Sequence, residues 1–268
     1  MNVARRLLAL MLPGLLLLVS CRTPAETPDV TATADAYQQD PAERDAVLAA
    51  LESLKQDTLR NAFAGLVRYR YTRYTRTEQH DATQRTAFSE YITRIDRHNG
   101  QRTQTILQAD STGAFDIGAL GGFVTANPAR RDAESLPEYV LTDDPPYLAP
   151  RNRDAFLYRF LPDTLFWDAP TQVIEVLAHP INGTVQSIRR TRFYLDRATN
   201  ELIAIYLERT ENALFFDEES RFYLRLRPAP DGGWVPFNVR FRTRLSLPLR
   251  PPRHLYTVST YYSYEATG

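Results

Sequence analysis

The residue types that most often carry chemistry are present in this sequence, but they lie far apart. The four histidines could bind a metal ion or move protons, yet no two have the i, i+4 or short-loop spacing that metal sites use. They are His80, His98, His179 and His254. The sequence also has no Gly-x-Ser-x-Gly elbow and no glycine-rich phosphate loop. It therefore predicts no catalytic residue, no metal site and no cofactor.

Because the sequence has two groups of carboxylates, hydrolysis of envelope polymers is a less favoured alternative function. Asp143 and Asp144 form one group, and Asp217, Glu218 and Glu219 form the other. A glycosidase needs two carboxyl groups at a fixed separation, which a sequence alone does not supply. Both groups lie in stretches that we expect to be loops, where solvated carboxylates are the usual explanation. We therefore expect the protein not to be an enzyme.

Cys21 is the only cysteine, and it follows a segment with the features of a secretory signal. Arg5 and Arg6 precede an apolar stretch, Leu7 to Val19, that is too short to cross a bilayer as a helix. With no second cysteine, no intramolecular disulfide can form. The alternatives are a lipid attached to the thiol and an ordinary secretory signal with an incidental cysteine.

The run Leu18-Val19-Ser20-Cys21 resembles the lipobox of bacterial lipoproteins. This resemblance implies a signal peptide at residues 1–20, cleavage before Cys21, and acyl chains such as palmitate on that cysteine. Several acyl chains would hold the mature protein on a membrane for a long time.

Net charge and composition give a few further expectations about partners and domain organisation. Removing Arg5 and Arg6 with the leader leaves 30 basic and 32 acidic residues, a net charge of −2. The arginines are spread along the chain, so we expect no nucleic-acid partner. Residues 21–39 are rich in Thr, Ala, Pro and Asp and are expected to be a flexible tether. Residues 40–268 are then one domain, whose oligomeric state the sequence does not indicate.

A helix is expected to open the domain. Asp40 is a candidate N-cap, Pro41 suits the first helical position, and Glu43 follows three residues after the cap. Apolar side chains then recur at three- and four-residue steps, which predicts one amphipathic helix of about 23 residues. The residues of this stripe are Val47, Leu48, Leu51, Leu54, Thr58, Leu59 and Phe63.

After Gly65 the period changes to two, which is typical of antiparallel strands with one buried face. We expect strands at 67–71, 88–95, 101–107, 173–178, 189–195, 202–209, 222–227, 234–247 and 255–264. Turn residues at 98–100, 110–113, 182–183, 196–200 and 230–233 should join neighbours as hairpins. In the strand at 234–247, Val235, Phe237, Val239 and Phe241 are expected to share the buried face.

Residues 115–170 have a different character, with many prolines and few alternating runs. Short helices are expected at 136–139 and 152–160. Such a long irregular insertion is more often a lid or binding loop than padding, and both alternatives stay open.

Aromatic residues at strand positions are the candidates for a ligand cavity. Most aromatic residues in strands are simply core. A curved sheet under a long helix would nevertheless form an apolar concavity suited to a lipid or an acyl chain. The candidate cavity residues are Tyr69, Tyr71, Phe88, Phe193, Phe237 and Phe241.

The order of these elements resembles the LolA/LolB-like superfamily of periplasmic lipoprotein carriers and their lipoprotein relatives. The resemblance rests on the helix before Gly65, on the segment Gln172 to Val176, and on the segment Arg192 to Ile203 with its Thr-bearing turn. It implies a mainly β (α+β) fold, in which a single curved antiparallel sheet forms an unclosed β-barrel. A long N-terminal helix and the middle insertion would cover that sheet.

The resemblance further implies a non-catalytic protein that binds lipid or lipoprotein acyl chains inside the half-barrel. With Cys21 as an anchor, the membrane-bound receptor type is the nearer analogue. Arg22 stands where an aspartate could mark inner-membrane retention, so the outer membrane, on its periplasmic side, is the expected location. The rival hypothesis is an envelope scaffold with the same fold, a filled core and no ligand.

Overall fold

The structure is a computed structural model that describes residues 39–55, 57–98, 101–115, 137, 140–141, 144–179, 187–213 and 216–267. These residues belong to one compact unit, Tyr37–Gly268. The expected signal peptide, Cys21 and all of the tether except Gln39 lie outside the described residues. Within the described part, no helix is long and apolar enough to span a membrane.

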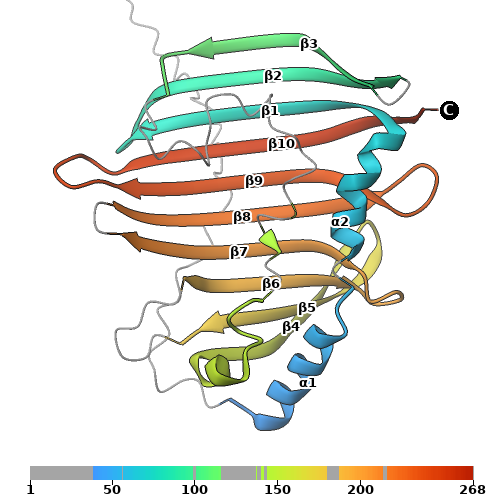
Figure 1. Cartoon of the computed structure of the whole chain (residues 1–268), viewed down its shortest axis with the longest axis vertical. Coiled ribbons are helices and arrows are strands. Elements are labelled where there is room, and N and C mark those ends of the chain that lie inside the picture. The colour runs from blue at the N-terminus through green and yellow to red at the C-terminus, as the bar shows by residue number, and fades with distance from the viewer. Residues whose placement is uncertain are drawn as a thin grey trace, which may run out of the picture. The chain divides into compact units, whose positions relative to one another are not determined.

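Ten antiparallel strands form a single sheet (Figure 1). Its order is β3-β2-β1-β10-β9-β8-β7-β6-β5-β4, so β3 and β4 are the edges and the sheet does not close. This confirms the predicted unclosed antiparallel architecture. The strands are β1 (Tyr69–Asp81), β2 (Gln84–His98), β3 (Gln101–Thr112), β4 (Phe156–Phe166), β5 (Ala169–Ala178), β6 (Ile188–Asp196), β7 (Leu202–Ala213), β8 (Phe216–Pro228), β9 (Trp234–Ser246) and β10 (Arg253–Ala266).

Every pair of adjacent strands except β1 and β10 is consecutive in the chain, which confirms the strand pairs expected around 98–100, 182–183, 196–200 and 230–233. The hairpin expected at 110–113 is wrong, because β3 and β4 lie at opposite edges of the sheet. At the turn between β8 and β9, the amide of Ala229 donates to the carbonyl of Gly233 at 3.0 Å. Gly232 and Gly233 have φ angles of +83° and +82°, which glycine adopts without a steric penalty. The turn predicted at 110–113 is wrong in part, since β3 continues through Thr112.

The predicted N-terminal helix is in two pieces, α1 (Pro41–Glu52) and α2 (Asp57–Ala64), with the 3-10 turn η2 (Gly65–Arg68) after them. Asp40 caps α1 as expected, accepting a hydrogen bond from the amide of Ala42 at 2.9 Å. The helix breaks where Lys55 bridges to Glu201 and donates from Nζ to the carbonyl of Thr199 at 2.9 Å. A tertiary contact thus overrides the continuous apolar spacing.

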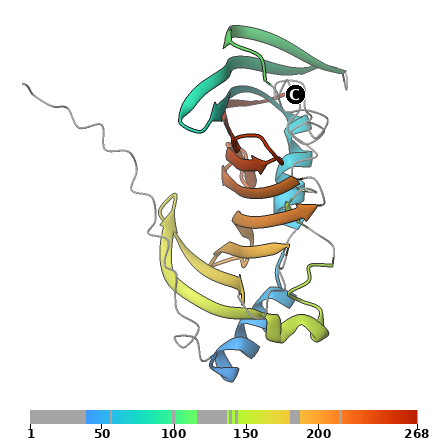
Figure 2. The same cartoon turned by 90° about the vertical axis from the view of Figure 1, so that its left-hand side faces the viewer.

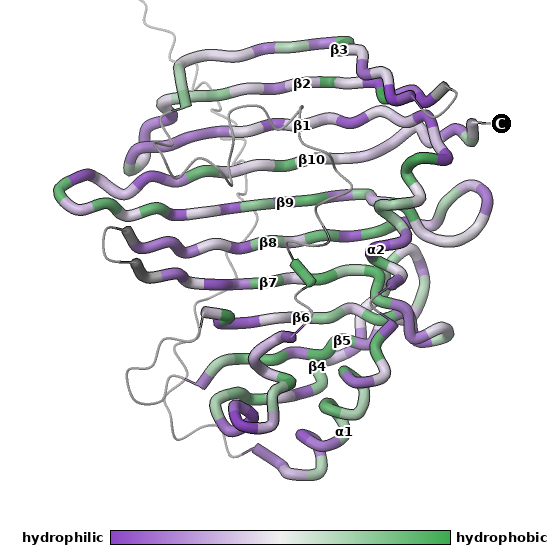
Figure 3. The backbone as a smooth tube through the Cα atoms, in the orientation of Figure 1, coloured by the Kyte–Doolittle hydropathy of each residue, from purple (hydrophilic) through white to green (hydrophobic). Residues whose placement is uncertain are grey.

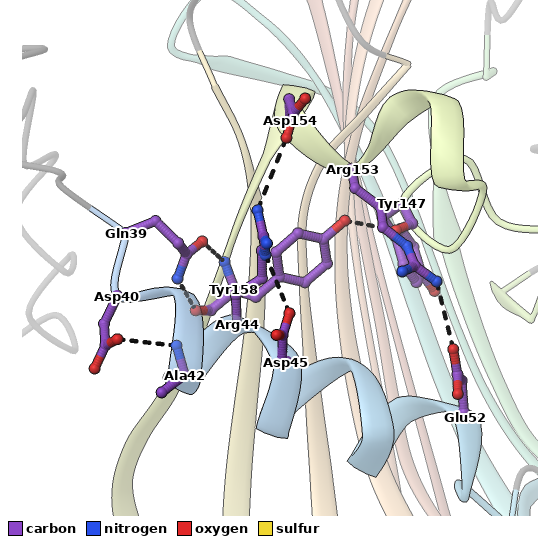
Figure 4. Close-up of polar contacts among 10 residues, drawn as sticks. All are labelled: Gln39, Asp40, Ala42, Arg44, Asp45, Glu52, Tyr147, Arg153, Asp154 and Tyr158. Atoms are coloured by element: carbon purple, nitrogen blue, oxygen red, sulfur yellow. Dashed lines mark hydrogen bonds and ion pairs between the residues drawn. The ribbon is translucent and has the colours of Figure 1, made fainter.

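Helix α1 is held on the edge strand β4 by a set of polar contacts (Figure 4). The side chain of Gln39 donates to the carbonyl of Tyr158 at 2.6 Å and accepts from its amide at 2.8 Å. The amide of Phe160 donates to Glu43 at 3.0 Å.

Helix α2 lies across the ends of β7 to β10 in Figure 1, on one side of the bent sheet in Figure 2. Helix α1 therefore covers the edge strand β4, whereas α2 covers the ends of strands in the middle of the sheet.

The prediction of a helix at 152–160 is wrong in its second half. A 3-10 turn, η5 (Pro150–Ala155), is followed at once by β4, which pairs with β5 along its length. Apolar and aromatic side chains at Phe156, Leu157 and Tyr158 suit a strand better than a helix. Residues 156–170 therefore belong to the sheet and not to an irregular insertion.

The described part of the middle insertion packs as core. Val140, Leu141 and Tyr147 are buried together with residues of β4 to β6. Strands β3 and β4, which precede and follow this insertion, lie at opposite edges of the sheet. The short helix expected at 136–139, and most of the segment expected to be a lid, lie outside the described residues.

A buried carboxylate ties β4, β5 and β6 together. The side chain of Glu175 has no exposed surface, and Arg192 and Arg159 each donate to it from Nε at 2.7 Å. Arg190 forms a third ion pair with it at 3.5 Å. Burial by itself raises the pKa of Glu175, but the hydrogen bonds and charges of Arg192 and Arg159 outweigh it and lower the pKa below its ordinary value.

We predict that Glu175→Gln destabilises the domain by about 2 to 3 kcal/mol, because it leaves three partly buried arginines without their carboxylate. Since the folded pKa of Glu175 is lowered, its contribution is complete above about pH 4.3 and is lost as the pH falls through the folded value. Urea unfolding at pH 7 and at pH 3 measures both effects.

Glu211→Gln is the matched control, because Glu211 is 57% exposed and its ion pair with Arg209 is 3.8 Å long. That substitution should change the free energy of unfolding by no more than about 0.5 kcal/mol. Equal losses in the two variants, or a Glu175→Gln loss that is unchanged at pH 3, would contradict this account of the network.

Candidate functional site

We call the side of the sheet on which α2 packs the inner face and the opposite side the outer face. Phe63 of α2 contacts Tyr261 of β10, with ring centroids 6.4 Å apart, which fixes Tyr261 on the inner face. Alternation and strand pairing then assign the other residues. Tyr71, opposite Ile95, lies on the inner face, whereas Glu78 and its partner Phe88 lie on the outer face.

The inner face changes its chemistry between β9 and β10. Side chains directly opposite one another form rows that run across the sheet. One row consists of Leu207, Phe222, Phe241, Thr257, Thr77 and Ser89. The next consists of Ile205, Leu224, Val239, Ser259, Thr75 and Tyr91. Hydrocarbon thus gives way to hydroxyl groups as each row passes from β9 to β10.

We call the inner face of β4 to β9 the apolar half and that of β10, β1, β2 and β3 the hydroxyl half. Figure 3 shows more hydrophobic residues along β5 to β9 than along β1. In the hydroxyl half, Thr75 pairs with Ser259 at 3.1 Å and Thr77 with Thr257 at 3.3 Å. The hydroxyl groups of buried Thr75 and Thr77 thus find partners in Ser259 and Thr257, which are partly exposed.

Tyr69 and Tyr71 lie in a filled aromatic cluster close to α2. The ring of Tyr71 stacks on Tyr264 at 5.7 Å and approaches Tyr261 at 6.0 Å. Tyr69 meets Tyr264 edge-on at 5.6 Å, and its hydroxyl donates to Asp231. The structure therefore brings these two candidate residues together, as packed core.

Phe193 and Phe241 also lie on the inner face, in the apolar half. Phe193 is fully buried against Tyr147, with ring centroids 6.1 Å apart. Phe241 opposes Phe222 at 6.5 Å and is only half-buried. Of the six candidates, Phe241 is the one that combines an inner position with accessible ring surface.

Phe88 and Phe237 lie on the outer face, so the expectation that Phe237 shares a face with Val239 and Phe241 is wrong. A register shift between Arg225 and Leu226 leaves Phe237 as the extra residue opposite β8. Its ring meets Trp167 at 4.8 Å, edge-on. Phe88 is covered on the outer face by the guanidinium groups of Arg76 and Arg85, at 5.2 and 4.9 Å.

Trp167 is the centre of an outer aromatic cluster that the sequence did not reveal. It lies at the tip of the β4–β5 hairpin with a φ of +52°, and its Nε1 donates to the carbonyl of Leu226 at 2.9 Å. The guanidinium group of Arg225 stacks over its ring at 4.4 Å. These contacts hold the hairpin tip against β8 and β9.

Histidines that are distant in sequence meet on the outer face. The pairing of β1 with β10 places His80 directly opposite His254, and Glu78 lies 3.1 Å from His80. Burial, together with Arg244 and Arg242, lowers the pKa of His254. Such a cationic setting disfavours a metal ion, and the described residues contain no group of three side chains able to hold one.

The carboxylates at 217–219 lie on β8 and not in a loop. Glu219 forms an ion pair with Arg244 at 3.2 Å. Asp143 lies outside the described residues. The pairing of β7 with β8 places Glu218 directly opposite Glu211. Nothing in the described part of the chain tests catalysis, so the prediction of a non-catalytic protein stays a prediction.

No protein-family model and no curated protein matches this sequence. Among solved structures, an outer membrane lipoprotein-sorting protein domain from Vibrio parahaemolyticus matches at 10% identity, with a TM-score of 0.31, over 84% of this chain and 93% of that one. A DUF1329 family protein from Desulfovibrio piger matches at 10% identity, with a TM-score of 0.30, over 84% and 93%.

A LolA superfamily protein from Nitrosomonas europaea matches at 12% identity, with a TM-score of 0.27, over 80% of this chain and 94% of that one. The similarity to each of these structures is low.

Proposed function

We propose that this chain is a lipid-anchored protein of the bacterial cell envelope that binds an acyl chain of a lipid or lipoprotein on the apolar half of its inner face. The observation that carries the proposal is the row of Leu207, Phe222 and Phe241 on adjacent strands, which ends at half-buried Phe241. The sheet that carries this row does not close, and its edges are β3 and β4.

An acyl chain suits this row for two physical reasons. Each methylene moved from water to an apolar surface contributes about 0.8 kcal/mol, so a long chain gains affinity without any specific polar contact. The row also continues into Thr257 and Thr77, which leaves polar groups for the other end of an amphipathic molecule. An amphipathic lipid therefore matches the face better than a wholly apolar guest.

The envelope location of the proposal rests on the N-terminal segment. A lipid on Cys21 would hold the domain at a membrane, with residues 22–39 as the tether. Arg22 supports the outer membrane, on its periplasmic side. Binding without catalysis agrees with a sequence that has no catalytic motif.

A scaffold without a ligand is the second candidate, and the cluster of Tyr69, Tyr71 and Tyr264 favours it. These rings fill the inner face close to α2. In a scaffold, the apolar half would be filled in the same way and would exclude a fatty acid.

We predict that the full chain carrying Cys21→Ala binds a fluorescent long-chain fatty acid, and that adding Phe241→Gln weakens binding about tenfold by exposing a polar amide in the row. Fluorescence titration measures the affinity. Phe237→Gln is the matched control on the same strand, because Phe237 is also a half-buried phenylalanine but lies on the outer face. No binding by the Cys21→Ala chain, or equal effects of the two substitutions, would favour the scaffold.

We further predict that cells expressing the protein incorporate radiolabelled palmitate into it, and that Cys21→Ala abolishes the label and releases the protein from the membrane fraction. Ser20→Thr serves as a control that keeps the acceptor thiol. Membrane attachment that persists in the Cys21→Ala variant would show that another feature anchors the chain.

A further inference from the structure

Three arginines lie on the inner face of the hydroxyl half, on neighbouring strands. Arg73 of β1 is only 3% exposed and lies opposite Tyr261 of β10. Arg97 of β2 lies directly opposite Arg102 of β3, and both are partly buried. Alternation along β1 and β2 places all three on the same side as Tyr71. We call Arg73, Arg97 and Arg102 the arginine cluster.

The positive charge of the arginine cluster acts on two buried phenols. Burial raises the pKa of Tyr71 to about 12, while Arg73, Arg102 and Arg97 act in the opposite direction. Burial also raises the pKa of Tyr261, again against Arg73 and Arg102. The guanidinium groups and the two hydroxyl groups therefore share one region of the inner face.

This part of the inner face carries positive charge with no acidic side chain facing it from the same strands. In the described stretches Tyr71–Gln79, Ala87–Arg97, Arg102–Ser111 and Leu255–Tyr261, the pairing register assigns no aspartate or glutamate to the inner face. Like charges directly opposite one another, as in Arg97 and Arg102, are unfavourable in a sheet, and a bound anion would offset part of that cost.

We propose that the arginine cluster binds the phosphate of an anionic lipid headgroup while the acyl chain of the same lipid lies on the apolar half. The inference rests on the function proposed above and adds the class of lipid to it. Guanidinium groups match phosphate oxygens with paired donors. Each arginine also interacts with other groups of the chain, and its five N–H donors allow it to keep such a contact while binding an anion.

The positions of the two subsites suit one amphipathic molecule. Phe241 of β9 and Arg73 of β1 lie on the same face with only β10 between their strands. The intervening side chains are the hydroxyl groups of Thr257 and Ser259, which hydrogen-bond to Thr77 and Thr75. The path from the apolar half to the cluster therefore becomes polar step by step.

The test compares two short-chain phospholipids that share their acyl chains, anionic phosphatidylglycerol and zwitterionic phosphatidylcholine. Calorimetric titration of the full chain with Cys21→Ala should show that the anionic lipid binds about tenfold more tightly, and that added salt narrows the gap. Arg97→Gln with Arg102→Gln should abolish the preference. The loss of affinity should be smaller for phosphatidylcholine, which carries the same phosphate but also a choline cation that the arginines repel. Arg94→Gln is the control, because Arg94 is exposed on the outer face of the same strand.

Substitution of Arg97 and Arg102 by lysine should keep part of the preference, and circular dichroism should show the folded sheet in every variant used. Equal affinities of the unsubstituted domain for the two phospholipids would overturn the headgroup site while leaving acyl binding intact. Binding of neither phospholipid would overturn the proposed function itself. Inorganic phosphate that binds through Arg97 and Arg102 when neither phospholipid does would assign the cluster to a free anion and would also overturn the headgroup site.

Discussion

The pairing of β1 with β10 is the constraint on which the rest of the structure depends, because it joins the first three strands to the last seven. Tyr69 to Asp81 pairs with Arg253 to Ala266, residues from distant parts of the chain. A slip of one residue would exchange the inner and outer faces of β1 to β3 relative to the other strands. The paired hydroxyl groups of Thr75 and Ser259, and of Thr77 and Thr257, form only in the observed register.

In this register, the two faces of the sheet make different kinds of contact. On the outer face, Glu175 forms ion pairs that join β4, β5 and β6. Trp167 at the tip of the β4–β5 hairpin forms a hydrogen bond to β8 and packs on β9. The inner face is filled where Tyr71 and Tyr264 support α2. The row of Leu207, Phe222 and Phe241 lies on the same inner face, and Phe241 is only half-buried.

The sequence was sufficient for most strands and hairpins, since alternation with one buried face and turns such as Asp196–Asn200 are local signals. It was insufficient where a distant contact decides the outcome. The helix breaks near Lys55 because that residue meets Glu201, although the apolar spacing continues. Phe237 changes face because of one register shift, and an alternating pattern gives no sign of such a shift. The strand β4 was hidden in a proline-rich stretch, and its pairing with β5 becomes clear only from the register.

The central claim is that an acyl chain lies on the apolar half of the inner face, and photo-crosslinking tests it most directly. A fatty acid with a diazirine at its chain terminus, irradiated with the full chain carrying Cys21→Ala, allows the modified residues to be mapped by tandem mass spectrometry. The account predicts adducts at Leu207, Phe222 or Phe241. Adducts confined to Phe166, Trp167 and Phe237 on the outer face, or none above the level of a denatured control, would contradict it.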